Sequence, residues 1–266
     1  MISTLRILGP TGVGKSTFIR NVLSGVDATH SQMPDIGEGS TACTQKITHY
    51  VVDLPSRGVA GTRAGGRRLI LVDTPGLDSH GTPEHSFELL RSITVWLASL
   101  HHDKLKLGAI IYMYPIYPGR ITRNELAIFR VFKKICGTQN LARVITITTK
   151  WDICPPKMGD DREAELWHAF LGQLANKRGR GVVMRLEDTR ESALNVLNEI
   201  ARHCVEFESE PVVYAIQREI VEEGSLLSNT AAAKALVAAL AQKSSASSFG
   251  DPLARMVAYF RHPVSP

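Results

Sequence analysis

Cysteine is scarce in this chain of 266 residues, which has four cysteines at positions 43, 136, 154 and 204 and no CxxC pair. Thiolate metal centres and a disulfide framework are therefore not expected, and a reducing compartment, the cytoplasm, is the expected location. The first residues lack the basic region and long apolar stretch of a signal peptide. No uninterrupted apolar run reaches the roughly 18–20 residues of a membrane helix, so membrane association has no support in the sequence.

Aromatic residues make up only 6% of the chain, and none is interleaved with its clustered arginines. Arg57, Arg63, Arg67 and Arg68 crowd one loop, where they could form either a patch for anionic lipid or nucleic acid or a solvated hairpin tip. The missing aromatics favour the solvated tip, so no nucleic-acid partner is expected. The formal net charge of +5 is mild and fits a site built for phosphates.

Short apolar runs alternate with helical patterns along most of the chain. Strands are expected at residues 5–8, 47–54, 67–73, 107–114, 143–149 and 181–186. Helices are expected at residues 15–24, 83–100, 122–137, 160–177 and 189–207. The second and third strands are predicted to pair as a hairpin. The remaining alternations indicate right-handed βαβ units and a mostly parallel sheet covered on both faces.

The pattern changes beyond Pro211, where strands stop and two helices are expected. The first, over residues 210–224, places Val212, Val213, Ile216 and Ile220 on one stripe. The second, over 229–242, is alanine-rich and is capped by Asn229 or Thr230. Residues 243–250 are typical of a flexible linker, and the final residues could form a docked short helix or a loose tail. The predicted domains are 1–208, an α/β domain; 209–243, a helical extension; and 244–266, a flexible linker and tail.

The segment from Gly9 to Ser16 reads G-P-T-G-V-G-K-S and matches GxxxxGK[ST] between a predicted strand and a predicted helix. In such a loop backbone N–H groups surround the α- and β-phosphates, Lys15 reaches the β- and γ-oxygens, and the Ser16 hydroxyl binds Mg²⁺. A glycine-rich turn without a ligand is the alternative, which the strand–loop–helix context disfavours. The sequence therefore predicts a three-layer P-loop NTPase fold of the Ras-like G-domain type, with a six-stranded sheet. The expected nucleotide contacts in this loop are Gly9, Thr11, Gly12, Val13, Gly14, Lys15, Ser16 and Thr17.

An aspartate follows an apolar strand in the segment VDTPG, residues 72–76. Asp73 is expected to hold a Mg²⁺-bound water, and Gly76 is expected to offer its N–H to a γ-phosphate. A plain DxPG turn is the alternative. The VDTPG segment lies at a strand end, well after the phosphate loop, and this place favours the nucleotide-binding interpretation.

The segment TTKWD, residues 148–152, follows another predicted strand and fits the T/NKxD pattern of a guanine site. Asp152 is able to accept hydrogen bonds from both N1–H and N2–H₂ of guanine, a pair of donors that adenine lacks. The stem of Lys150 is expected to lie over the base. Thr149 stands where asparagine is more usual, so one tie to the phosphate loop is expected to be weaker. A solvated Lys–Asp pair is the alternative.

Two further loops complete the expected site. The segment before the second strand offers Thr44 or Thr41 as a switch threonine, which binds Mg²⁺ through its hydroxyl and the γ-phosphate through its N–H. Thr44 is preferred because it lies closer to that strand. The loop after the sixth strand offers Glu187 as a contact to the base, while Asp188 or Thr189 could cap the following helix.

These motifs together resemble the septin-like branch of GTPases, which includes septins, Toc chloroplast-import GTPases and the avirulence-induced, immunity-associated type. The nearest resemblance is to small fungal G-domain proteins. It covers most of residues 5–240 and is carried by ACTQKI, DTPGLD, LLRSITVWL, LGAIIYMYPI, KICG, TTKWD, DREAEL, DTRESALNVL and NTAAAKAL. In that family the turn after the fourth strand carries a His-Arg pair, where this chain has Tyr114-Pro115. The resemblance implies binding of GTP, GDP and Mg²⁺, hydrolysis of GTP, and pairing of two G domains through the switch face.

The residue after Gly76 is Leu77, where Ras-like GTPases place the glutamine that orients the attacking water. Leucine lacks a group for this task, so hydrolysis is expected to be slow or to draw the group from elsewhere. His80 is the local candidate, beside Asp78, Ser79 or an arginine or histidine of a partner. An ordinary exposed loop histidine is the alternative for His80. The expected catalytic set is Lys15, Thr44, Gly76 and His80.

Three functions fit these observations, in descending order. The first is a GTP-hydrolysing molecular switch that pairs with a second copy, its effectors being open. The second is a GTP-binding assembly module with negligible turnover, which Leu77 favours. The third is a P-loop ATPase or kinase, which the TKWD segment argues against.

Overall fold

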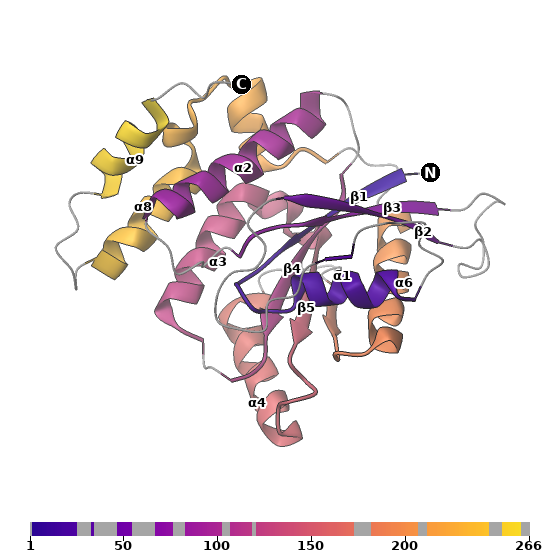
Figure 1. Cartoon of the computed structure of the whole chain (residues 1–266). Helices are drawn as coiled ribbons and strands as arrows, with labels where there is room; N and C mark the ends of the chain where they lie inside the picture. Colours follow the sequence, from indigo (N-terminus) through magenta and orange to yellow (C-terminus); the bar gives the residue numbers. More distant parts are fainter. Residues whose placement is uncertain are drawn as a thin grey trace. The chain divides into compact units, whose positions relative to one another are not determined.

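The computed structural model describes residues 2–25, 33–34, 47–54, 67–76, 83–102, 107–118, 121–172, 182–206, 212–244 and 252–261 (Figure 1). The chain divides into two compact units, here called the sheet unit and the helical unit. The sheet unit comprises Met1–Gly76, Lys106–Arg120 and Ala142–Pro211, and the helical unit comprises Leu77–Leu105, Ile121–Leu141 and Val212–Pro266.

The described residues of the sheet unit form a six-stranded sheet in the order β2-β3-β1-β4-β5-β6. The strands are β1 (Ile2–Leu8), β2 (Thr48–Leu54), β3 (Arg67–Asp73), β4 (Leu107–Pro115), β5 (Val144–Thr149) and β6 (Val182–Arg185). Only β2 runs antiparallel to its neighbour, β3, and the other pairs are parallel. The predicted α/β class, the mostly parallel sheet and the hairpin are therefore confirmed. β5 is buried along its whole length, which explains its uninterrupted β-branched sequence VITITT.

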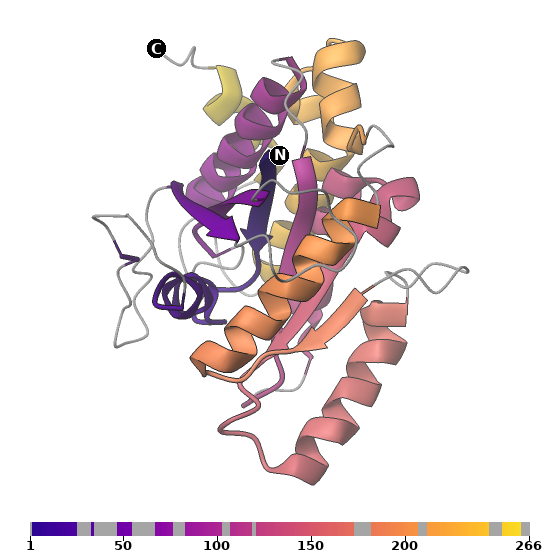
Figure 2. The same cartoon turned by 90° about the vertical axis from the view of Figure 1, so that its right-hand side faces the viewer.

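Helices of the sheet unit are α1 (Lys15–Leu23), α4 (Pro156–Leu166), which continues as a π-helical segment η2 (Trp167–Leu171), and α6 (Arg190–Glu206). α1 and α6 share one core with alternate residues of the central strands, among them Phe18, Leu71, Ile111 and Ile200. Both helices therefore cover the same face of the sheet, as Figure 2 lets the reader follow. This packing places the beginning of α1 and the loop before α6 close to the ends of β1 and β5, where the candidate site lies.

The helical unit contains α2 (Pro83–His102), α3 (Arg123–Cys136), the 3-10 segment η1 (Thr138–Arg143) at its boundary, the short α7 (Ala215–Gln217) with a π-helical segment η3 (Arg218–Glu222), the 3-10 turn η4 (Leu227–Asn229), α8 (Ala231–Ser244) and α9 (Pro252–Arg261). α8 packs on α3, and α9 packs on α2. The predicted capping box of Thr122 and Glu125 is confirmed by both of its hydrogen bonds, and Gly137 ends α3 as expected. Of the two predicted caps for α8, Thr230 is the one observed, because its Oγ1 accepts from Ala233 N at 3.2 Å.

The helix expected to begin at residue 210 begins later. Val212 and Val213 precede the helical turns, which start at Ala215. The Val213 carbonyl accepts a hydrogen bond from Asn140 Nδ2 at 2.7 Å, and the N–H of Tyr214 donates to Gln217 Oε1 at 2.8 Å. Asn140, a residue outside the helix, therefore satisfies the Val213 carbonyl, and Gln217 of α7 caps the N–H of Tyr214, so the backbone before Ala215 needs no helical hydrogen bonds.

Of the two alternatives for the final residues, a docked short helix or a loose tail, the structure shows the docked helix, α9. α9 lies against α2 through an ion pair of Arg255 with Glu84 and a contact of the Phe87 and Tyr259 rings, whose centroids are 6.1 Å apart. The two compact units also follow other boundaries than the predicted domains, because α2 and α3 pack with helices beyond residue 211. Within the described part of the chain, no helix is long and apolar enough to cross a membrane.

Candidate functional site

The loop between β1 and α1 has the backbone geometry that the motif predicts. Gly12 and Gly14 lie at φ 72° and φ 101°, in the left-handed region that side chains disfavour. Gly14 directly precedes the first residue of α1, so the N–H groups of the first helical turn face the loop. The positive end of the helix dipole and these N–H groups form an environment suited to an anion.

Lys15 is held inside its own loop. Its Nζ donates hydrogen bonds to the carbonyl oxygens of Gly9 at 3.2 Å and Pro10 at 2.8 Å, and the side chain is buried. A buried ammonium group needs such acceptors because burial without them is costly. The charge is thus placed at the centre of the loop, where phosphate oxygens would replace or add to these carbonyls.

Ser16 and Asp73 meet although 57 residues separate them in the sequence. Ser16 Oγ donates to Asp73 Oδ2 at 2.7 Å. The other carboxylate oxygen, Oδ1, accepts from the N–H of Thr74 at 3.0 Å, and Thr74 Oγ1 donates to the carbonyl of Ile7 at 2.6 Å. The end of β3 is thereby fixed to the end of β1. A hydroxyl and a carboxylate at this separation are ligands that suit Mg²⁺, so the two residues fit the metal site that the sequence predicts.

Gly76 lies directly against the phosphate loop. A Cβ atom at this position would lie 2.0 Å from Thr11 Oγ1 and 2.5 Å from Thr11 N. Only glycine fits at such a distance. The DTPG turn and the phosphate loop are therefore in contact, as a shared γ-phosphate site requires.

Thr149 connects the TTKWD segment to the phosphate loop. Its Oγ1 donates to the carbonyl of Val13 at 2.8 Å, and both residues are buried. The tie that the sequence led us to expect to be weak is present, because a threonine hydroxyl at the end of β5 reaches the phosphate loop directly. Lys150 follows at φ 68°, an uncommon conformation for a residue with a side chain, and Asp152 is exposed two residues later.

The loop after β6 lies beside β5 and α1, to which it is hydrogen-bonded. The N–H of Leu186 donates to the carbonyl of Thr148 at 2.8 Å, and Asp188 Oδ1 accepts from Asn21 Nδ2 of α1 at 2.9 Å. Thr189 caps α6 by accepting from the N–H of Ser192 at 3.1 Å, so it fills the role that was open between Asp188 and Thr189. Glu187 is exposed, and its N–H donates to Ser192 Oγ at 3.0 Å.

One group at this site was not anticipated from the sequence. Trp151 Nε1 donates to Thr148 Oγ1 at 3.0 Å, and the Arg185 guanidinium carbon lies 4.0 Å from the centre of the Trp151 ring. Arg185 is held by Glu163 and by Asp160, the latter at 2.9 Å. Hydrogen bonding to Glu163 is the largest cause that raises the pKa of Arg185. The tryptophan within TTKWD was the available signal, but nothing in the sequence identifies its partner.

Other predicted residues lie outside the described part of the chain. They are Thr41 and Thr44 of the expected switch segment, and Leu77, Asp78, Ser79 and His80 after the DTPG turn. Within the described residues, the structure brings together the phosphate loop, Asp73, Gly76 and Thr149, with Lys150, Asp152 and Glu187 on the loops that adjoin them.

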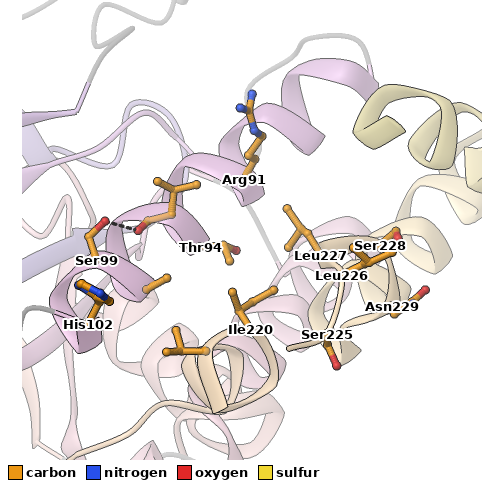
Figure 3. A pocket seen from close by; sticks show the side chains of 13 residues that line it. Arg91, Thr94, Ser99, His102, Ile220, Ser225, Leu226, Leu227, Ser228 and Asn229 are labelled. Atoms are coloured by element: carbon orange, nitrogen blue, oxygen red, sulfur yellow. Dashed lines mark hydrogen bonds between the residues drawn. The ribbon is translucent and has the colours of Figure 1, made fainter. Parts of the chain in front are cut away.

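A separate groove lies within the helical unit and has a different character (Figure 3). It has a volume of about 870 Å³ and is lined by α2 from Arg91 to His102 and by the segment from Ile220 to Asn229. Val221 and Leu226 are exposed there. The described lining includes Arg91 but no lysine, aspartate or glycine, so this groove differs in composition from the loop between β1 and α1.

The comparisons with known proteins agree with this geometry. The model of a family described as 50S ribosome-binding GTPase matches residues 4–144, more than half of the chain. Toc33 from Arabidopsis thaliana in complex with Mg²⁺ and GMPPNP is 14% identical, with a TM-score of 0.53 over 80% of this chain and 88% of that chain. A structure concerned with dimerization in the GTPase activity of the chloroplast translocon components atToc33 and psToc159 is 13% identical. Its TM-score is 0.57, over 80% of this chain and 86% of that chain.

At these identities the structural likeness shows the fold, which is that of a P-loop GTPase. A search of curated proteins finds no match to the chain. The resemblance to septins and to small fungal G-domain proteins stays a prediction.

Proposed function

Because the chain belongs to the 50S ribosome-binding GTPase family, we propose that it binds GTP and GDP with Mg²⁺ and hydrolyses GTP slowly, as a molecular switch. The observation that carries this proposal is the hydrogen bond of 2.7 Å between Ser16 Oγ and Asp73 Oδ2. It joins the phosphate loop to the DTPG turn at the point where a metal ion bound to the β- and γ-phosphates would lie.

Each part of the phosphate site has its own task. Backbone N–H groups around Gly12 and Gly14 would surround the α- and β-phosphates, while Lys15 would turn its ammonium group toward the β- and γ-oxygens. The N–H of Gly76 would donate to the γ-phosphate. Ser16 and Asp73 would hold Mg²⁺, which when bound neutralises the charge that develops on the phosphate oxygens.

The base site is proposed on the loop from Thr149 to Asp152. Asp152 would accept two hydrogen bonds from guanine, and the stem of Lys150 would cover one face of the ring. Support comes from the hydrogen bond of Thr149 to Val13, which fixes this loop to the phosphate loop. Glu187 is proposed to contact the base from the neighbouring loop.

Slow turnover is proposed because Leu77 stands where a water-orienting glutamine is expected. His80 or a residue of a partner would supply the missing group, and Thr44 would complete the metal site. The printed description of atToc33 and psToc159 states that dimerization is important for their GTPase activity. By analogy, we propose that pairing of two copies through the switch face raises the activity of this chain.

A second candidate is a GTP-binding assembly module without significant turnover, which the same leucine favours. A P-loop ATPase or kinase ranks third, because the TKWD segment with Asp152 argues against it.

Calorimetry in the presence of Mg²⁺ tests the binding proposal. GDP and GTP are expected to bind the full chain, and Lys15→Ala is expected to abolish binding because the phosphates lose their only side-chain charge in the loop. Lys157→Ala is the matched control, since Lys157 is an exposed lysine on α4 of the same unit. If neither nucleotide binds to well-folded wild-type protein, the proposed function is wrong. Displacement of a GTP analogue by ATP as readily as by GTP would favour the third candidate.

Hydrolysis under single-turnover conditions separates the first two candidates. We expect measurable but slow conversion of GTP, with a specific activity that rises with protein concentration. Absence of conversion at every concentration would favour the assembly module. A constant specific activity over a wide concentration range would contradict activation by pairing.

A further inference from the structure

Trp151 lies in the sequence between the two residues proposed to contact the base, Lys150 and Asp152, and its side chain contacts other elements of the sheet unit. Its Nε1 donates to Thr148 Oγ1 at 3.0 Å, so the indole is hydrogen-bonded to the end of β5. A Cβ atom at Gly159 would lie 2.7 Å from the ring, which shows how closely the backbone of α4 approaches it. The indole is therefore fixed between β5 and α4.

Arg185 lies over a face of the same ring. The register of the parallel pair places Arg185 of β6 beside Thr148 of β5, three residues before Trp151. From there the guanidinium carbon lies 4.0 Å from the ring centre, well within the range of a cation–π contact. Asp160 and Glu163 of α4 hold the guanidinium from its edge. The loop after β5, strand β6 and helix α4 thus all contribute to one cluster around Trp151, here called the Trp151 cluster: Trp151, Arg185, Asp160 and Glu163.

The backbone conformation of Lys150 shows why the Trp151 cluster matters for the loop from Thr149 to Asp152. The residue lies at φ 68°, a left-handed conformation that costs energy for any residue with a Cβ atom and that persists only when neighbouring contacts impose it. On one side Thr149 is anchored to Val13 at 2.8 Å, and on the other side Trp151 is anchored by its cluster. The two anchors leave the backbone at Lys150 little freedom.

We propose that Trp151 and Arg185 are positioning residues for guanine recognition. Their stack holds the backbone of Lys150 and Asp152 in the arrangement that receives the base. This inference rests on the proposed function, because it assigns the cluster to the base half of that site. It predicts that loss of the stack weakens the contacts to guanine and leaves the phosphate half of the site unchanged.

The experiment compares two probes on folded full-length protein by calorimetry with Mg²⁺: GDP, which uses both halves, and inorganic pyrophosphate, which uses only the phosphate half. Arg185→Ala is expected to raise the Kd for GDP about threefold to tenfold, in line with loss of a cation–π contact and the loop order that depends on it. The Kd for pyrophosphate is expected to stay as in wild type. Arg185→Lys keeps the charge but loses the flat guanidinium, so it is expected to show a smaller effect of the same kind.

Arg202→Ala is the matched control. Arg202 is an exposed arginine of the same unit that pairs with Glu199 at 2.7 Å, and its substitution is expected to change neither Kd. Trp151→Phe keeps the ring and removes the hydrogen bond to Thr148, which gives a second variant should Arg185→Ala fail to fold.

The outcomes are distinct. A merely structural role would lower the melting temperature while the ratio of the two Kd values stayed at its wild-type level, and that result overturns the inference. Equal weakening of GDP and pyrophosphate would also overturn it, since the effect would then not be confined to the base. Failure of wild-type protein to bind GDP would instead refute the proposed function.

Discussion

Replacing Thr149 with valine removes one hydroxyl from the junction between the base loop and the phosphate loop. Valine has nearly the shape of threonine and the same branching at Cβ, so β5 is expected to keep its packing. The change deletes the hydrogen bond from Thr149 Oγ1 to the carbonyl of Val13, which measures 2.8 Å. Thr149 is 4% exposed and Val13 is fully buried, so water does not replace the lost donor.

The magnitude follows from that burial. A buried acceptor that loses its partner costs about 1–3 kcal/mol in the free energy of unfolding. For a chain of this size, each kcal/mol corresponds to about 2–4 °C in the melting midpoint, so a decrease of about 2–12 °C is expected. The affinity for GDP is expected to fall as well, because the two loops would no longer be held together.

Thermal unfolding and calorimetry with GDP provide the assay, with two controls on β5. Thr149→Ser keeps the hydroxyl and is expected to retain most of the stability and affinity. Thr146→Val changes another fully buried threonine of the same strand, whose Oγ1 has no hydrogen-bond partner among the described residues. Its substitution is expected to leave the melting midpoint unchanged or to raise it, because a buried unpaired hydroxyl is unfavourable. If Thr149→Val melts together with Thr146→Val and binds GDP like wild type, the coupling role of Thr149 is refuted.

Three further predictions concern other parts of the molecule. Asp152→Asn is expected to weaken the preference for guanine by about 1–3 kcal/mol, measured by competition between GTP and ATP, and an unchanged preference would exclude Asp152 from base recognition. Gly76→Ala is expected to destabilise the fold by about 1–3 kcal/mol in thermal denaturation, because its Cβ atom would lie 2.5 Å from the backbone nitrogen of Thr11. Wild-type melting of that variant would contradict the close contact of the two loops. Burial raises the pKa of the Cys136 thiol, so the folded chain keeps this proton while the unfolded chain releases it above about pH 9. Stability is therefore unaffected below that pH and falls above it by about 1.4 kcal/mol per pH unit relative to Cys136→Ser, which urea unfolding at several pH values would measure. Equal pH dependence of the two proteins would show that Cys136 is not the group involved.

Local patterns in the sequence were sufficient for much of the fold and for the phosphate loop. The periodicity of strands and helices is specified by residues that lie close together in the sequence. The same holds for the capping box of Thr122 and for the glycines that precede α1. The hairpin of β2 and β3 and the parallel direction of the remaining strands followed from the same alternation, whereas the order of the strands did not. The start of the helix near Tyr214 was misjudged because a distant side chain, Asn140, binds the carbonyl before it.

Contacts between distant segments were decided by the tertiary structure. The sequence contains Thr149, Gly76 and Arg185, but only the tertiary structure shows that Thr149 reaches Val13, that Gly76 touches Thr11 and that Arg185 covers Trp151. The packing of α3 with α8, and hence the division into two units, likewise appears only in the structure. The physical reason is that residue type and spacing specify which backbone conformations and chemical groups are available locally. Which groups meet across many residues depends on strand order and helix packing, and these follow from the burial of the whole core rather than from any one segment.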